Sequence, residues 1–246
     1  RVLFTINSNF VDDNGINKIK VVSVFLEENN GNLWIGTEGG GLHYYNQQKD
    51  NYIHYTSSNN NSIAGNNIKS LAKDEIGNLW IGTFSGLSCL NIKTQQFTNY
   101  YSKKGFSNSI NNNQVHAIYV ENPGKIWIGT NGGGLQIFDP VSCNFFNIPW
   151  LEREKINTIF VDKFNRLWVG SQDGIRCIDK ITLKEINISG ILREYKSSII
   201  YVNIITGDSS GNIWIGTQGY GLFLIQESQI YWFNKSNGLT DNTINS

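Results

Sequence analysis

A four-residue motif returns five times along this chain of 246 residues. Trp-Ile-Gly-Thr begins at Trp34, Trp80, Trp127 and Trp214, and the variant Trp-Val-Gly-Ser begins at Trp168. Consecutive tryptophans lie 46, 47, 41 and 46 residues apart. A period of about 40 to 50 residues that contains several short strands is typical of the blades of a β-propeller. The repeat therefore predicts an all-β fold of this kind.

Each repeat predicts four antiparallel strands, and the second repeat shows the pattern. We expect its strands at Ile68–Lys73, Asn78–Thr83, Leu87–Asn91 and Gln96–Tyr100, with a tight turn at Gly77 between the first two. The third strands are continuously apolar, which indicates burial on both faces of the sheet. The blades are therefore expected to stack face to face, with the five motif tryptophans filling the space between neighbouring blades.

The repeats predict five complete blades within a single propeller segment that covers residues 1–246. They span approximately residues 20–56, 66–100, 113–148, 154–188 and 199–233. Partial blades are expected at both termini, because residues 1–6 resemble an outer strand and residues 242–246 match the start of a first strand. Unpaired blade edges promote association, so we expect the chain to be part of a larger propeller.

The composition argues against two classes of partner. Lys and Arg number 20, Asp and Glu also number 20, and only 16% of the residues are charged. Proteins that bind nucleic acid or anionic lipid normally carry a basic excess, so neither partner is expected for this segment. No apolar run approaches the ~18 residues of a membrane span, and none is expected to insert into a membrane. The three cysteines show neither metal-ligand spacing nor a disulfide framework.

The repeated unit resembles a known family. Asp74–Thr83 reads Asp-x-x-Gly-Asn-Leu-Trp-Ile-Gly-Thr, and glycine runs follow the motif at Glu38–Leu42 and Asn131–Leu135. This unit resembles the two-component regulator propeller repeat, from about Lys20 to Ser246. The fourth repeat departs from the pattern, since it is shorter and has Gln172-Asp173-Gly174 in place of the glycine run.

The resemblance implies a periplasmic sensor segment of a hybrid two-component histidine kinase from Bacteroides-type bacteria. Such proteins combine two seven-bladed propellers, a β-sandwich, a membrane span, a kinase core and a DNA-binding output domain. Their ligands are typically oligosaccharides, and their output controls polysaccharide-utilisation genes. The resemblance further implies a homodimeric parent protein in which this segment contacts the rest of the ectodomain. It transfers no catalytic motif to this chain, so we expect no enzyme activity of the segment itself.

A binding site is expected on the face that carries the turns between second and third strands and the connections between blades. Flat aromatic rings, amides and carboxylates there suit a hydroxyl-rich ligand. The candidate ligand-binding residues in the turns are Glu38, Phe84, Asn131, Gln172, Asp173, Gln218 and Tyr220. Those in the connections are Trp150, Arg153 and Arg193. We expect no cofactor and no metal.

Other chemistries fit the sequence less well. The glycine run Gly39-Gly40-Gly41 is followed by a strand, whereas a phosphate-binding loop needs a helix N-terminus. Asp74 and Gly77 are spaced differently from the residues of a sialidase aspartate box. No pair of carboxylates has a spacing that indicates glycoside hydrolysis.

Three hypotheses for the function follow. The first is a ligand-sensing segment, in which the ligand biases one arrangement of the ectodomain. The second is an architectural or dimerisation module without a ligand site of its own. The third, a propeller lyase or hydrolase, has the least support.

Overall fold

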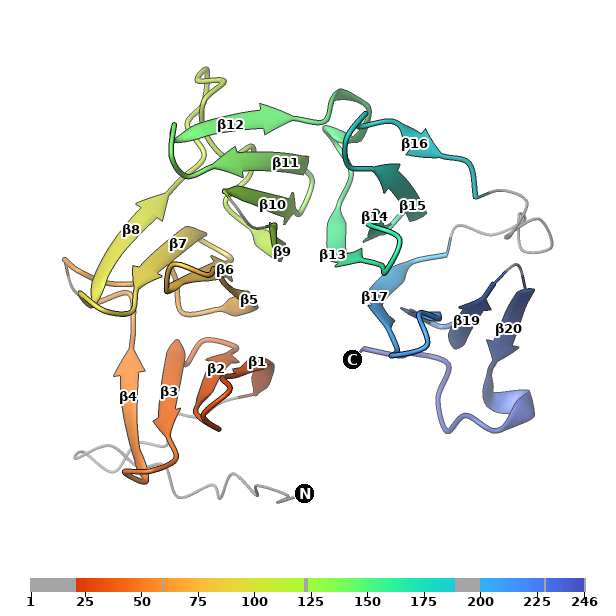
Figure 1. Ribbon diagram of the computed structural model, residues 1–246, viewed down its shortest axis with the longest axis horizontal. Coiled ribbons are helices and arrows are strands. Elements are labelled where there is room, and N and C mark those ends of the chain that lie inside the picture. The colour runs from red at the N-terminus through yellow and green to blue at the C-terminus, as the bar shows by residue number, and fades with distance from the viewer. Residues whose placement is uncertain (1–20, 59, 122–123, 189–199, 228, 246) are drawn as a thin grey trace. The chain divides into compact units, whose positions relative to one another are not determined.

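A computed structural model describes residues 21–58, 60–121, 124–188, 200–227 and 229–245. These residues form five four-stranded antiparallel sheets, and within each sheet the strands pair in chain order. This arrangement confirms the predicted propeller blades (Figure 1). The chain divides into two compact units, residues 1–101 and 102–246. Residues 1–6, expected to form an outer strand, lie outside the described residues.

The first unit contains two blades. Blade 1 consists of β1 (Val22–Glu27), β2 (Leu33–Thr37), β3 (Leu42–Asn46) and β4 (Asn51–Tyr55). Blade 2 consists of β5 (Ile68–Lys73), β6 (Asn78–Thr83), β7 (Gly86–Asn91) and β8 (Gln96–Tyr100). The strands predicted for the second repeat are confirmed, except that the third strand begins one residue earlier, at Gly86.

The described residues of the second unit form three blades and two short 3₁₀ helices. Blade 3 consists of β9 (Val115–Glu121), β10 (Lys125–Thr130), β11 (Gly134–Asp139) and β12 (Asn144–Asn147). Blade 4 follows the helix η1 (Pro149–Leu151) and consists of β13 (Ile156–Val161), β14 (Arg166–Ser171), β15 (Gly174–Asp179) and β16 (Glu185–Ile186). Blade 5 consists of β17 (Val202–Gly207), β18 (Ile213–Thr217), β19 (Leu222–Gln226) and β20 (Gln229–Phe233), followed by η3 (Lys235–Asn237).

Three of the motif tryptophans lie in the apolar layers between blades of the same unit. Trp127 is fully buried in a cluster with Leu167 of blade 4, and Trp168 is fully buried in a cluster with Ile213 of blade 5. Trp34 packs in the same way against β6. Burial of a Trp side chain removes more apolar area from water than burial of any other side chain does. Blades 1, 3 and 4 therefore use their tryptophans to hold the blade that follows in the same unit.

The glycine of the motif has a packing role. A Cβ atom on Gly36 would lie 2.6 Å from Cγ2 of Ile68, the first residue of the next blade's first strand. Gly129 meets Ile156, and Gly170 meets Val202, in the same way. A β-branched side chain thus fills the space that a missing Cβ leaves, and the two blades approach closely.

The last residue of the motif closes the turn that follows. The hydroxyl of Thr37 donates to the carbonyl of Gly41 at 2.8 Å, and this bond is buried. The equivalent hydroxyls of the other four blades donate to the carbonyl of the glycine at, or directly before, the start of the third strand: Thr83 to Gly86, Thr130 to Gly134, Ser171 to Gly174 and Thr217 to Gly221. The glycine run is therefore a hairpin turn and no phosphate-binding loop.

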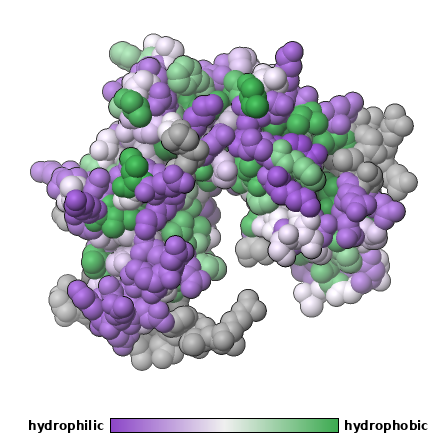
Figure 2. Space-filling view, viewed as in Figure 1, coloured by the Kyte–Doolittle hydropathy of each residue, from purple (hydrophilic) through white to green (hydrophobic). Residues whose placement is uncertain are grey.

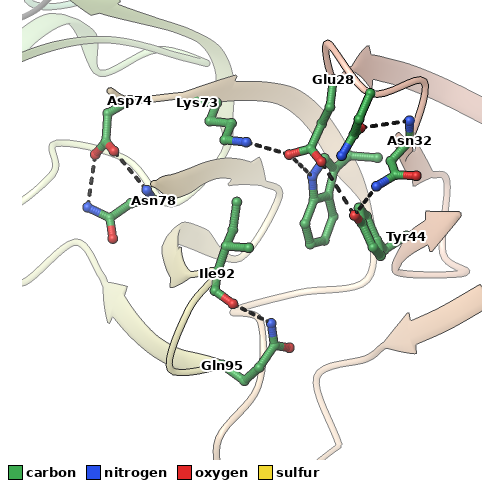
Figure 3. A network of polar contacts seen from close by, with 10 residues as sticks. Glu28, Asn32, Tyr44, Lys73, Asp74, Asn78, Ile92 and Gln95 are labelled. Atoms are coloured by element: carbon green, nitrogen blue, oxygen red, sulfur yellow. Dashed lines mark hydrogen bonds and ion pairs between the residues drawn. The ribbon is translucent and has the colours of Figure 1, made fainter. Parts of the chain in front are cut away.

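A carboxylate six residues before each tryptophan accepts a hydrogen bond from the indole Nε1–H. The pairs are Glu28 with Trp34, Asp74 with Trp80, Glu121 with Trp127, Asp162 with Trp168 and Asp208 with Trp214. In the first unit Lys73 of blade 2 reaches back to Glu28 of blade 1, which joins the two blades (Figure 3). The repeated carboxylate is thus a partner for the indole of its own blade, which sequence reasoning did not foresee.

The residues after blade 5 take the place of the next first strand. Ile244 lies over Gly216, as Ile68 lies over Gly36. The side chain of Asn203 donates to the carbonyl of Ile244 at 3.0 Å. That residues 242–246 form the start of a further first strand stays a prediction. The single segment over residues 1–246 and the number of blades in the parent ring stay predictions.

Candidate functional site

One residue directly after each motif occupies an equivalent place in all five blades. Its backbone N–H donates to the carbonyl of the residue that precedes the first strand of the same blade. The pairs are Glu38 with Val21, Phe84 with Asn67, Asn131 with Gln114, Gln172 with Lys155 and Gln218 with Tyr201. Five of the predicted ligand-binding residues are therefore fixed at one repeated position, which carries Glu, Phe or Asn in the first three blades and Gln in the last two.

A β-bulge adds a second repeated position beside the first. In every blade the pairing of the first strand with the second skips the second residue of the first strand. A bulge bends the strand and redirects a side chain. The bulge residues are Ser23, Lys69, His116, Asn157 and Asn203. No local turn signal marks these positions, so the sequence reasoning missed them.

In the first unit the bulge residue brings two predicted residues together. The ammonium of Lys69 lies 2.9 Å from Oε1 of Glu38, which comes from blade 1. The same ammonium lies 5.3 Å from the centre of the Phe84 ring, which comes from blade 2. All three side chains are partly exposed. A carboxylate, a cation and an aromatic face thus meet at one accessible point, and hydrophilic side chains cover much of blade 1 in Figure 2.

The second unit offers amides and a phenol. The side-chain amide of Asn131 donates to Oε1 of Gln114 at 2.6 Å. The amide of Gln172 donates to the hydroxyl of Tyr201 at 3.1 Å. Amide and hydroxyl groups both donate and accept hydrogen bonds, which matches the needs of a neutral ligand rich in hydroxyls. Gln114 and Tyr201 were not among the predicted residues, because they precede strands whose bulges the sequence does not reveal.

The other predicted residues fall into two groups. Asp173, Gln218 and Tyr220 are exposed in the turns of blades 4 and 5. Arg153 is exposed in the connection before β13, whereas Trp150 donates from Nε1 to the carbonyl of Leu183 at 3.2 Å, next to the outer strand of blade 4. The structure thus places Trp150 toward the outer strands rather than with the turns. Arg193 lies outside the described residues.

Glu154 is a further polar group that the sequence did not single out. Its Oε1 accepts from Arg176 at 3.3 Å, and its backbone carbonyl holds the N–H of Gly134 in the turn of blade 3. Its Oε2 is buried, and no described residue donates a hydrogen bond to it. A buried acceptor of this kind calls for a donor such as water or a ligand hydroxyl. Glu154 therefore extends the candidate site of the second unit.

The carboxylates with a lowered pKa lie at the other ends of the blades. Burial alone would raise the pKa of Glu121 and Asp162, but hydrogen bonds from Lys180 and Trp127 to Glu121, and from Trp168 and Arg166 to Asp162, outweigh it. In the turns after β11 and β15, hydrogen bonds within the turn lower the pKa of Asp139 and Asp179. These shifts have structural causes, and the described turn residues show no arrangement of paired carboxylates for acid–base chemistry. The described residues also contain no cluster of three or more potential metal ligands.

No helix among the described residues is long and apolar enough to cross a membrane.

Comparisons with known proteins give a consistent picture. The chain is 28% identical over 201 residues to histidine kinase P4 of Formosa agariphila, an alignment that covers 73% of this chain and 14% of the relative. The extracellular domain of a hybrid two-component system from B. thetaiotaomicron superposes with a TM-score of 0.68 at 22% identity, covering 89% of this chain and 30% of that one. The chain thus spans only a small part of these two proteins.

A third similar structure has a different activity. Virginiamycin B lyase of Staphylococcus aureus superposes with a TM-score of 0.68 at 17% identity, covering 92% of this chain and 73% of that one. At such identities the likeness of both solved structures shows the fold alone. The family model of the two-component regulator propeller matches residues 18–39, 62–85 and 109–132, which contain the first three motifs. The first three repeats of the chain thus match the two-component regulator propeller family.

Proposed function

We propose that this chain is a ligand-sensing, extracytoplasmic propeller segment of a hybrid two-component histidine kinase, that its ligand is an oligosaccharide, and that the parent protein controls polysaccharide-utilisation genes. The observation that carries the proposal is the repeated turn position, where the same backbone hydrogen bond in five blades presents four different kinds of side chain. Support also comes from the family model that matches the first three repeats, and from the histidine kinase that aligns with most of the length of this chain.

The chemistry of the turns fits a sugar better than a charged ligand. Asn131, Gln172 and Tyr201 supply donors and acceptors, and Phe84 supplies a flat apolar face. Sugar rings present hydroxyls at their edges and C–H groups on their faces, which these two kinds of group bind. The buried Oε2 of Glu154 accepts one further hydroxyl.

A thermal-shift screen against a panel of oligosaccharides tests this function. The chain is measured beside a longer chain that is extended at both ends, and the products of every stabilising compound are analysed. A sensor predicts a rise in Tm while the glycan remains intact. A shift seen only with the longer chain would favour the architectural alternative, and absence of any shift from both chains would contradict glycan sensing.

Variants locate the binding surface. Asn131→Ala, Gln218→Ala and Glu154→Gln are expected to reduce the shift, because each removes a hydrogen-bonding group from the turns or their connections. Gln48→Ala is the matched control, since Gln48 is an exposed amide in the turn between β3 and β4, at the other end of its blade. Equal shifts for the control and for all three variants would count against this surface.

A lyase is the second candidate, because virginiamycin B lyase shares the fold over most of both chains. The same screen separates the two functions, since a lyase converts its ligand and a sensor leaves it unchanged. The described turns show no acid–base arrangement, so the sensor remains the proposal.

A further inference from the structure

The connections that enter blades 2 and 3 share a short motif that ligand sensing leaves unexplained. Asn-Ser-Ile occurs at residues 61–63 and again at residues 108–110. The asparagine-rich connections have the composition of ordinary polar loops. Their contacts show a specific role instead.

In blade 2 the side chain of Asn61 binds the backbone at the start of the outer strand β8. Its Oδ1 accepts from the N–H of Phe97 at 2.7 Å, and its Nδ2 donates to the carbonyl of Gln95 at 2.8 Å. A primary amide has an acceptor and a donor side by side, like a peptide group. Asn61 thus occupies the outer edge of the sheet in the manner of a further strand.

In blade 3 Asn108 makes the same pair of contacts with β12. Its Oδ1 accepts from the N–H of Phe145 at 2.8 Å. Its Nδ2 donates to the carbonyl of Cys143 at 3.3 Å and to Oδ1 of Asn144 at 3.1 Å. Gln95 and Cys143 are equivalent, because both precede an outer strand and both have positive φ.

The next two residues of the motif fix the asparagine in place. The carbonyl of Ser62 accepts from the side chain of Asn99 in β8, and the carbonyl of Ser109 accepts from the buried Gln136. The isoleucines Ile63 and Ile110 are almost completely buried. A buried anchor and a second hydrogen bond reduce the entropy that the asparagine loses on binding the strand.

The position of these contacts, at the edge of an outer strand, indicates what they do. The outer strand of a blade has one unpaired edge, and unpaired edges pair with strands of other molecules. In blade 4 the connection contacts the corresponding position through a different residue. Trp150 donates to the carbonyl of Leu183, which also has positive φ and also precedes an outer strand. The connections that enter blades 2, 3 and 4 thus each bind the residue with positive φ that precedes the outer strand.

We propose that Asn61 and Asn108 are edge locks. Each covers the free edge of the outer strand of its blade, β8 for Asn61 and β12 for Asn108, and so prevents that strand from pairing with an outer strand of a second copy of this chain.

Amide hydrogen exchange of the unaltered chain tests the lock directly. The N–H groups of Phe97 and Asn99 point to the same outer edge, because alternate residues of a strand share one side. Phe97 N–H is bonded to Asn61, whereas the described part of the chain supplies no acceptor for Asn99 N–H. We expect Phe97 to exchange about tenfold more slowly than Asn99, and Phe145 more slowly than Asn147. Equal exchange within both pairs would overturn the proposal.

Substitutions test the consequence. Asn61→Ala and Asn108→Ala are expected to speed exchange at Phe97 and Phe145 respectively by about tenfold, and to produce concentration-dependent dimers in sedimentation velocity. Asn61→Asp keeps the acceptor for Phe97 and loses the donor to Gln95, so its exchange at Phe97 should stay close to that of the unaltered chain. The matched control Asn60→Ala, at the neighbouring exposed residue, should change neither measurement. Variants that stay folded and monomeric at all concentrations would refute closure against a second copy.

Discussion

At the scale of single residues, the motif glycine shows how one missing atom determines the contact between blades. A Cβ on Gly129 would overlap the side chain of Ile156, which starts the next blade. We predict that Gly129→Ala lowers the free energy of unfolding by about 2 kcal/mol, because the overlap forces side chains or backbone to shift. Chemical denaturation followed by Trp fluorescence measures the change.

A double-mutant cycle identifies the cause. Ile156→Ala removes the methyl group that meets the new Cβ, so the cost of Gly129→Ala should be smaller in the Ile156→Ala background than alone. Additive costs would show that the destabilisation arises from something other than this contact.

A second residue-scale prediction concerns Glu121 and Lys180. The ammonium of Lys180, whose side chain is 4% exposed, lies 2.9 Å from Oε1 of Glu121. Glu121→Gln retains an acceptor for the Trp127 indole but leaves the buried cation without its counter-charge. We predict a loss of about 3 kcal/mol at pH 7, measured by denaturant unfolding. The control Glu152→Gln, at an exposed carboxylate, should cost less than about 0.5 kcal/mol.

The same pair gives a pH dependence. Burial opposes the charge of Glu121, but the hydrogen bonds from Lys180 and Trp127 lower its pKa below the ordinary 4.5. Its contribution to stability is therefore complete above pH 4.5 and disappears as the pH falls through the lowered value. Thermal unfolding from pH 6 to pH 3 should show a smaller loss of stability in Glu121→Gln than in the unaltered chain. A parallel loss in both proteins would contradict this assignment.

At the scale of elements, the bulge in the first strand joins blade 1 to blade 2 and blade 4 to blade 5. Asn157 donates from Nδ2 to the carbonyl of Val202 at 2.8 Å, and Ser23 of blade 1 donates to Ile68 in the same way. We predict that Asn157→Ala costs about 1 kcal/mol, because a partly buried carbonyl loses its donor. Asn157→Ser should recover part of this loss, since serine serves at this position in blade 1. Equal destabilisation by the two variants, measured by urea denaturation, would exclude the hydrogen bond as the cause.

The strands could be predicted because their signals are local. Alternation, glycine turns and the repeated motif located Ile68–Lys73, Asn78–Thr83 and Gln96–Tyr100 at the bounds that the structure shows. The bulges and the edge locks could not, because each depends on a partner 36 to 45 residues away. A polar residue at the second position of a strand does not predict which backbone carbonyl its side chain will bind.

At the scale of the whole molecule, the thiols of Cys89 and Cys177 report on whether blades 2 and 4 are folded. Burial, together with the charge of Asp74, raises the pKa of Cys89 to about 12, and burial raises that of Cys177 to about 11. Cys143 is exposed. We predict that Ellman's reagent at pH 8 modifies one thiol rapidly in the native chain and three in denaturant, because the thiolate is the reactive form. Rapid modification of two or three native thiols would mean that a blade core is open.

The sequence by itself determined the blade, because everything that specifies a blade recurs within about 47 residues: tryptophan spacing, turn glycines and apolar third strands. It also located the five turn positions, since each follows its motif directly. Only the tertiary structure determined which other side chains the residues at those positions contact. Lys69 joins Glu38 and Phe84 only because a bulge turns its side chain toward blade 1, and Tyr201 meets Gln172 only because consecutive blades pack together. Contacts between blades depend on close packing across the gap, which no repeat within one blade encodes.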